Sequence, residues 1–329
     1  MRRALVLLLV GIALTVSGNS IARAQEFVSP EDTVAFAWSP DGTHYAMGRG
    51  NGLVALFDSA GVLVHGFSVA PGPANFVQWD DSGTRLAAAG DAVIIIYTLA
   101  TRDRIMLDFI RIETVGRALA AFDFSPDGGR VIYALNTPFP VRSAEIFSLS
   151  DSTLERRLRA TDDINDITAL AWNPDGTRIA IASHIADTDA LVFVDIATRA
   201  RQMAAASTRI DTLSWSPDGA RIAGGSRDLT IWDAATGDVL NDPVAAAQGA
   251  LRSVAWNADS TQFVAGYDDG TVAVFDAETG ESLAVYTTGA AGPAPASWNW
   301  ADDTIGYPDA SGNLIVQPAP QPVEAAGNA

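Results

Sequence analysis

Residues Leu213–Asp233 read LSWSPDGARIAGGSRDLTIWD, and near copies of this stretch recur along most of the chain. Two segments, Leu213–Trp215 and Arg221–Ala223, alternate apolar and polar residues with the period of two that half-buried strands show. Between them lies the SPDG turn at 216–219, in which proline fixes φ, aspartate bonds its own backbone and glycine accepts a positive φ. A second turn leads into 229–233 and a third follows it, so the unit predicts a four-stranded antiparallel meander.

The unit recurs seven times. The aromatic residues that end its first strand lie 41 to 48 residues apart and are Trp38, Trp79, Phe124, Trp172, Trp215, Trp256 and Trp300. This period is typical of propeller blades and solenoids. One such sheet cannot bury both of its faces, whereas seven sheets around an axis can. The sequence therefore predicts an all-β fold, a seven-bladed β-propeller of four-stranded antiparallel blades.

The ends of the third strands carry a family resemblance. Residues 232–237 read WDAATG and residues 275–280 read FDAETG. Together with the SPDG turns, they resemble WD-repeat β-propellers over residues 25 to about 317, and the WSPDGxRIA wording is also similar to the periplasmic propeller of the Tol system. The resemblance implies a platform for partners, because such propellers mostly act in that way.

The sequence departs from the WD-repeat pattern at one position. Blades of that family often carry a Gly-His pair before the first-strand aromatic, and its histidine joins a buried network with tryptophan and aspartate. Here the corresponding positions hold residues such as Ala206 and Ala247. We therefore expect that network to be absent.

The first 24 residues predict a secretory signal peptide. Arg2 and Arg3 precede an apolar run, Ala4–Val16, and Ala22-Arg23-Ala24 forms a cleavage signature. An uncleaved anchor is the alternative, but the run is short for a bilayer span. Cleavage after Ala24 predicts a secreted or periplasmic protein, with no membrane insertion afterwards, a propeller at 25–317 and a disordered Pro/Ala-rich tail at 318–329.

Composition limits the partners. The chain has no cysteine, so burial of its 48% hydrophobic residues has to stabilise it, and its formal charge of −18 becomes −21 when the signal peptide is removed. Such a negative field disfavours nucleic acid and anionic lipid. We expect a monomer that binds a protein partner and needs no cofactor.

Closure of the ring is predicted from the two ends of the propeller. Pro318, Pro320 and Pro322 remove the backbone donors along one edge of the tail. We therefore expect Glu26–Val28 to supply the outer strand of the seventh blade and so close the ring. The alternative is that the proline-rich tail itself forms this edge strand.

The irregular segments are predicted to lie on the face opposite the SPDG turns. The SPDG turns recur in nearly every blade, which indicates a structural role. On the other face, long second turns are expected at 137–142 and 184–189, and long links between blades at 110–117 and 160–166. Added loop length on a rigid scaffold often marks a binding site, although neutral variation of surface loops is the alternative.

Two groups of candidate site residues follow. The partner-binding hypothesis rests on an aromatic residue and an arginine in the first of these turns, since such residues contribute most of the binding energy at interfaces. Together with neighbours in the second turn, the candidate residues are Phe139, Arg142, His184, Asp187 and Asp189. The cation-binding hypothesis adds the carboxylates of the adjacent link, Asp162, Asp163 and Asp166. The alternatives are packing of the phenylalanine on the next blade and a solvated acidic face.

Motifs of catalysis are missing from the sequence. It has no cysteine nucleophile, no H-E-x-x-H, no G-x-S-x-G and only three histidines, His44, His65 and His184. We predict a non-enzymatic, extracytoplasmic interaction scaffold that binds through the face opposite the SPDG turns. The alternatives are a module that binds a small ligand, glycan or cation at the channel mouth, and a carboxylate- or metal-dependent hydrolase or lyase in the channel.

Overall fold

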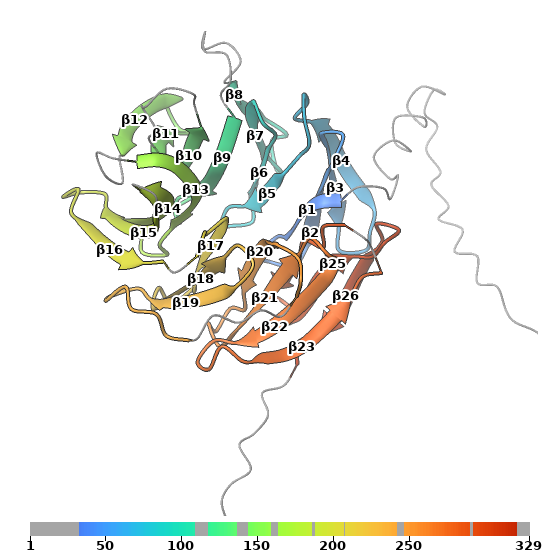
Figure 1. Ribbon diagram of the computed structural model, residues 1–329. Helices are drawn as coiled ribbons and strands as arrows, with labels where there is room; N and C mark the ends of the chain where they lie inside the picture. Colours follow the sequence, from blue (N-terminus) through green and yellow to red (C-terminus); the bar gives the residue numbers. More distant parts are fainter. Residues whose placement is uncertain are drawn as a thin grey trace, which may run out of the picture.

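The computed structural model describes residues 33–108, 118–136, 144–158, 164–185, 188–206, 208–241, 247–289 and 292–320. In these residues, 26 strands form seven antiparallel sheets and there is no helix. The sheets stand side by side around a central axis (Figure 1). The prediction of an all-β, seven-bladed propeller is therefore confirmed. Within the described ranges, nothing helical is long and apolar enough to cross a membrane.

Five blades have four strands that pair in chain order. Blades 1 and 2 contain β1 (Thr33–Trp38), β2 (His44–Arg49), β3 (Leu53–Asp58), β4 (Leu63–Ser68), β5 (Phe76–Trp79), β6 (Arg85–Ala89), β7 (Val93–Thr98) and β8 (Arg104–Asp108). Blades 3 and 4 contain β9 (Ala118–Phe124), β10 (Arg130–Asn136), β11 (Ala144–Ser148), β12 (Thr153–Leu158), β13 (Ile164–Trp172), β14 (Arg178–Ile185), β15 (Thr188–Asp195) and β16 (Arg201–Ala205). Blade 6 contains β20 (Leu251–Trp256), β21 (Gln262–Tyr267), β22 (Thr271–Asp276) and β23 (Ser282–Thr287).

The other two blades have three strands each among the described residues. Blade 5 contains β17 (Thr212–Trp215), β18 (Arg221–Gly225) and β19 (Leu229–Asp233), and a single bridge between Trp232 and Val239 takes the place of a fourth strand. Blade 7 contains β24 (Ser297–Asn299), β25 (Thr304–Pro308) and β26 (Leu314–Pro318).

The predicted closing strand, Glu26–Val28, lies outside the described residues, so closure by this segment stays a prediction. The C-terminal edge is ordered beyond the expected boundary at 317. β26 includes Pro318, and the carbonyl of Pro320 accepts a hydrogen bond of 3.0 Å from the Gln262 side chain of blade 6. The propeller therefore extends at least to Pro320.

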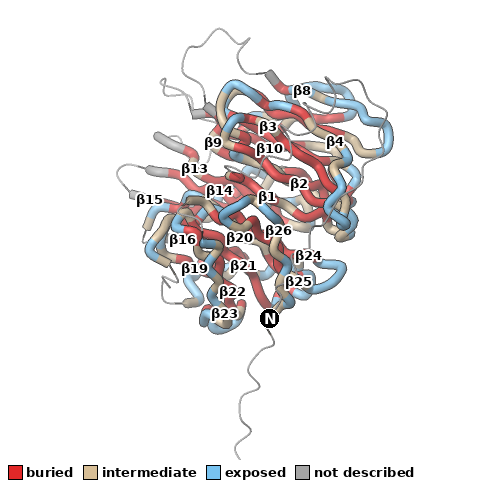
Figure 2. Tube along the Cα trace, turned by 90° about the vertical axis from the view of Figure 1, so that its right-hand side faces the viewer, coloured by how far each residue is buried: buried red, intermediate tan, exposed pale blue. Residues whose placement is uncertain are grey.

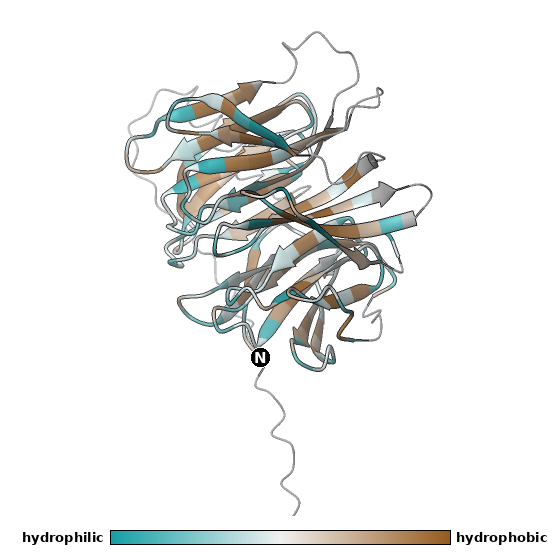
Figure 3. Cartoon of the chain, turned by 90° about the vertical axis from the view of Figure 1, so that its left-hand side faces the viewer, coloured by the Kyte–Doolittle hydropathy of each residue, from teal (hydrophilic) through white to brown (hydrophobic). Residues whose placement is uncertain are grey.

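The hydrophobic core lies between neighbouring blades. Buried residues follow the strands, and exposed residues gather at the turns (Figure 2). Apolar residues likewise run along the strands, while many hydrophilic residues lie at strand ends (Figure 3). One cluster shows the arrangement: Leu191 and Phe193 of blade 4 pack with Trp215, Ile222 and Trp232 of blade 5. Each sheet thus buries both faces against its neighbours, as the repeat predicted.

Tryptophans at the ends of the first strands also bond across the blades. The Trp79 indole donates to the backbone carbonyl of Ala37 at 3.2 Å, and the Trp215 indole donates to that of Ala171 at 3.1 Å. The guanidinium of Arg178 lies 5.5 Å from the centre of the Trp215 ring. These contacts fix the inner strands of adjacent blades against each other.

In the seventh blade, the prediction of which aromatic residue ends the first strand was wrong. Trp298, not Trp300, is the counterpart of Trp215, because Trp298 pairs with Ile305 as Trp215 pairs with Ile222. Trp298 is 3% exposed, whereas Trp300 lies in the following turn and is 39% exposed. The seventh turn has neither proline nor glycine, so nothing in the sequence decided which of the two tryptophans ends the strand.

Blades 7 and 1 meet through their inner strands. The hydroxyl of Ser297 accepts a hydrogen bond of 3.2 Å from the backbone N–H of Trp38. Gly306 packs so closely on Trp38 that a Cβ at this position would overlap the indole nitrogen. These contacts join the first and last blades within the described residues.

Candidate functional site in the central channel

Most of the predicted site residues lie outside the described residues: Phe139, Arg142, Asp162, Asp163 and Asp187. Asp166 is placed on β13 and His184 on β14, without a description of their side chains, and Asp189 lies on β15. The partner-binding and cation-binding hypotheses for these residues therefore stay predictions.

Two of the expected irregular segments contain regular strand. β14 continues to Ile185 and β15 begins at Thr188, with His184 opposite Asp189. In the same blade, 164–166 belongs to β13 instead of to a link. The prediction of a long turn over 184–189 was therefore wrong. Backbone pairing continues from Arg178 opposite Asp195 to Ile185 opposite Thr188, so the two strands pair almost to the end of the hairpin.

The SPDG turns satisfy their own polar groups. In blade 5, the Asp218 carboxylate accepts hydrogen bonds from the Ser216 hydroxyl at 2.6 Å and from the Ala220 backbone N–H at 2.9 Å. In blade 3, the Ser125 hydroxyl and the Gly129 backbone N–H hold the pKa of Asp127 below its ordinary value. These carboxylates are engaged in shaping the turns, which agrees with the structural role expected for them.

A cavity of about 560 Å³ follows the central axis and is lined by the inner strands of all seven blades. At the end where the SPDG turns lie, the lining is mostly apolar and includes Pro40, Pro126, Pro174, Pro217 and Trp300. Asp81 lines the cavity at the position that proline holds in blade 1, because the turn of blade 2 reads DDSG. A carboxylate therefore replaces proline at one point of this rim.

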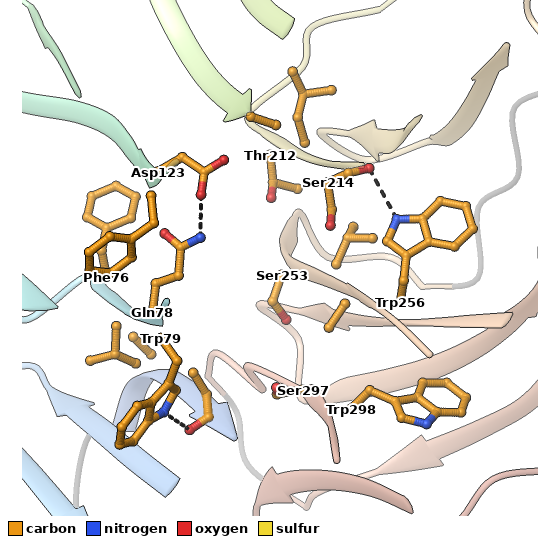
Figure 4. A pocket seen from close by; sticks show the side chains of 18 of the residues that line it. Phe76, Gln78, Trp79, Asp123, Thr212, Ser214, Ser253, Trp256, Ser297 and Trp298 are labelled. Carbon is orange, nitrogen blue, oxygen red and sulfur yellow. Dashed lines mark hydrogen bonds between the residues drawn. The ribbon is translucent and has the colours of Figure 1, made fainter. Parts of the chain in front are cut away.

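Polar side chains meet along the wall of the channel. Figure 4 shows Gln78 of β5 and Asp123 of β9 on one side. Across the opening it shows the hydroxyl groups of Thr212, Ser214, Ser253 and Ser297. The channel thus sets one carboxyl and one carboxamide opposite a group of hydroxyls.

Asp123 connects three blades. Its Oδ1 accepts a hydrogen bond from the Gln78 side chain, and its Oδ2 accepts one of 2.5 Å from the backbone N–H of Trp172. Burial raises the pKa of Asp123 from 3.8 to about 7, against the effect of these two hydrogen bonds, and the charge of Asp81 adds to the rise. Burial also raises the pKa of Asp81, and the neighbouring Asp80 contributes.

Among the described residues that line the channel, the remaining charged side chain is that of Arg252. Its guanidinium pairs with Asp268 at 3.2 Å, so part of its charge is already compensated. In the part of the chain that the structure describes, no three histidine, aspartate or glutamate side chains gather closely enough to hold a metal ion. The described wall therefore offers hydrogen bonds and negative charge.

The sequence contained a signal for this site that was missed. The residue directly before the aromatic that ends the first strand is small in five of the seven blades. These residues are Ala37, Ala171, Ser214, Ala255 and Ser297. In the other two copies it is Gln78 and Asp123. Two large polar residues at a position otherwise kept small could have marked the channel, once the seventh copy was placed at Trp298.

Replacing Asp123 with asparagine should remove a pH dependence of stability. The folded protein holds the Asp123 proton up to about pH 7, whereas an aspartate in the unfolded chain loses it near pH 4, so stability falls as pH rises between these values. Asparagine can still accept from Trp172, and the Gln78 amide can turn to pair with it. We expect Asp123→Asn to be more stable than the parent by about 4 kcal/mol at pH 8, with little difference near pH 4.

Urea unfolding of both proteins from pH 4 to pH 8 measures this effect. The exposed Asp238 supplies the control, because Asp238→Asn removes the same charge away from the channel. Parallel stability curves for Asp123→Asn and the parent protein would contradict the prediction.

Two family models match parts of the chain. The family described as "WD domain, G-beta repeat" matches residues 200–233, and the "Anaphase-promoting complex subunit 4 WD40 domain" matches residues 230–303. Together the matches run from β16 of blade 4 to β24 of blade 7, and they include the WDAATG and FDAETG segments. No curated protein matches the chain.

Proposed function

This chain is a WD-repeat β-propeller, and from that premise we propose that it is a protein-interaction scaffold that works outside the cytoplasm and binds through the face opposite the SPDG turns. WD40 propellers commonly mediate protein interaction and are generally non-catalytic. A rigid ring suits this role because it presents loops without having to order them on binding.

The observation that supports this face is the length of the β14–β15 hairpin. β14 and β18 both begin six residues after the aromatic of their blade, but β14 has 8 residues and β18 has 5. At roughly 3.3 Å per residue, the hairpin of blade 4 extends about 10 Å further than that of blade 5. β10 of blade 3, with 7 residues, is also long. Blades 3 and 4 therefore raise one side of this face above the rest.

Shortening this hairpin tests the proposed docking face. Replacing residues 184–189 with Asn-Gly leaves Ser183 opposite Ala190 and closes the strands with a two-residue turn. We expect the variant to melt within a few degrees of the parent protein and to lose a stoichiometric partner that co-purifies from the native envelope fraction. The control is Glu278→Arg, an exposed change in the third turn of blade 6, on the SPDG side.

Two outcomes would count against the docking face. The partner could remain with the shortened hairpin, or it could be lost equally with Glu278→Arg. The same purification tests the location, because the intact mass should correspond to a chain that begins at Gln25. A full-length chain in the cytoplasmic fraction would contradict the extracytoplasmic part of the proposal.

A further inference from the structure

The central channel carries an excess of acidic side chains, which the proposed docking of a partner on the loop face does not explain. Two carboxyls, Asp81 of blade 2 and Asp123 of blade 3, line the cavity. Among the described lining residues, Arg252 is the one cation, and it already pairs with Asp268. The channel wall therefore carries negative charge without an equal positive charge, in a chain whose net charge is −18.

The carboxyl of Asp123 retains hydrogen-bonding capacity toward the channel. Its oxygens accept hydrogen bonds from the Gln78 side chain and from the backbone N–H groups of Trp172 and Phe124. A carboxylate offers about four acceptor sites, so about one remains for a ligand. Figure 4 shows that the carboxyl lies at the edge of the opening, across from hydroxyl groups that can accept further N–H donors.

The rest of the wall suits an apolar chain. Phe76 and Phe122 lie in edge-to-face contact, with ring centres 5.7 Å apart, and both line the cavity together with Val77, Leu170 and Leu213. The cavity volume of about 560 Å³ falls within the range of small-molecule sites. At the rim, Trp300 is 39% exposed and offers an aromatic face, which attracts cations.

We propose that the central channel binds a primary ammonium group carried on an alkyl chain, with the ammonium against Asp123 and Asp81 and the methylenes along Phe76 and Phe122. A primary ammonium has three N–H donors, and the remaining acceptor site of the Asp123 carboxylate can accept one of them. The group can come from a free amine or from a lysine side chain of a bound protein, since both present the same chemistry.

A cation fits this wall better than a neutral polyol. A polyol would also find the hydroxyls and the amide, but above pH 7, where Asp123 is ionised, it would leave the carboxylates without compensation in a partly buried site. Burial raises the pKa of both carboxyls. A bound cation has the opposite effect, because it favours the ionised forms and lowers both pKa values. In the described part of the chain, the other charged side chains that line the channel are Asp81 and Arg252, and Arg252 pairs with Asp268. Binding should therefore tighten as pH rises through about 7.

Calorimetric titration of the full chain with 1,4-diaminobutane at low salt tests the proposal. We expect saturable binding at pH 8, about tenfold weaker at pH 6 because one tenth of Asp123 is then ionised. Asp123→Asn should weaken binding at pH 8 by tenfold or more, as expected for the loss of a charge-assisted hydrogen bond. Asp238→Asn, which removes an exposed charge outside the channel, should leave the affinity unchanged.

Three results would overturn the inference: no saturable binding of the diamine, equal weakening by Asp123→Asn and Asp238→Asn, or binding of glucose in place of the diamine. A parallel titration with Nα-acetyl-lysine methylamide identifies the source. Tighter binding of the diamine supports a free amine, and tighter binding of the lysine derivative supports a protein side chain. The test is independent of the loop-face proposal, because it needs no partner and leaves residues 184–189 intact.

Discussion

Trp215→Ala should lower the free energy of unfolding by about 3–5 kcal/mol. Trp215 is 7% exposed and packs between blades 4 and 5, with its ring centre 5.9 Å from that of Phe193. The substitution also removes the indole hydrogen bond to the Ala171 carbonyl and the surface on which Arg178 stacks. The resulting cavity would lie between two rigid sheets, which can collapse into it only partly.

Urea unfolding followed by circular dichroism measures the loss. Trp215→Phe is the matched control, because it keeps an aromatic ring and should lose clearly less than Trp215→Ala. Binding of a partner by the folded protein should not change, since Trp215 lies within the ring. A loss below about 1 kcal/mol for Trp215→Ala would contradict the inter-blade packing described for this residue.

A second large effect is expected at Trp298. Trp298→Ala should also cost about 3–5 kcal/mol, because this side chain is 3% exposed and packs with Ile305 and Tyr307 in the cluster between blades 6 and 7. Trp300→Ala should cost only about 1 kcal/mol. Trp300 is 39% exposed and loses mainly its hydrogen bond of 2.8 Å to the Trp256 carbonyl.

These two variants are controls for each other, since they remove the same side chain two residues apart. Their free energies of unfolding should be measured under identical conditions. If Trp300→Ala proved the more damaging of the two, the strand of blade 7 would end at Trp300 and the register of β24 and β25 would be wrong.

The repeat predicted the architecture because its signals are local. The SPDG turn around Asp218 and the period-two alternation on either side depend on neighbours within a few residues. The same argument failed at Trp300, where the turn lost its proline and glycine and two tryptophans competed for one position. Local chemistry was ambiguous there, and pairing with β25 decided the register.

The site was predicted less well, because irregular sequence is weak evidence of irregular structure. Residues 184–189 were expected to form a loop, yet His184 and Asp189 face each other on paired strands. The pairing partner of a residue at a hairpin end is set by the whole hairpin, and the sequence of the end alone does not contain it. For Phe139 and Arg142 the partner-binding hypothesis stays a prediction.

The sequence by itself determined seven blades, their turns and the aromatic side chains that pack between most of them, since each of these rests on a pattern within one repeat. Only the tertiary structure decided the channel. Gln78 and Asp123 are 45 residues apart and meet because adjacent blades pack side by side, and Ser253 and Ser297 face them because the ring closes. Contacts between distant repeats depend on how the sheets pack, so the charge and hydrogen bonding of the channel appear only once the ring is assembled.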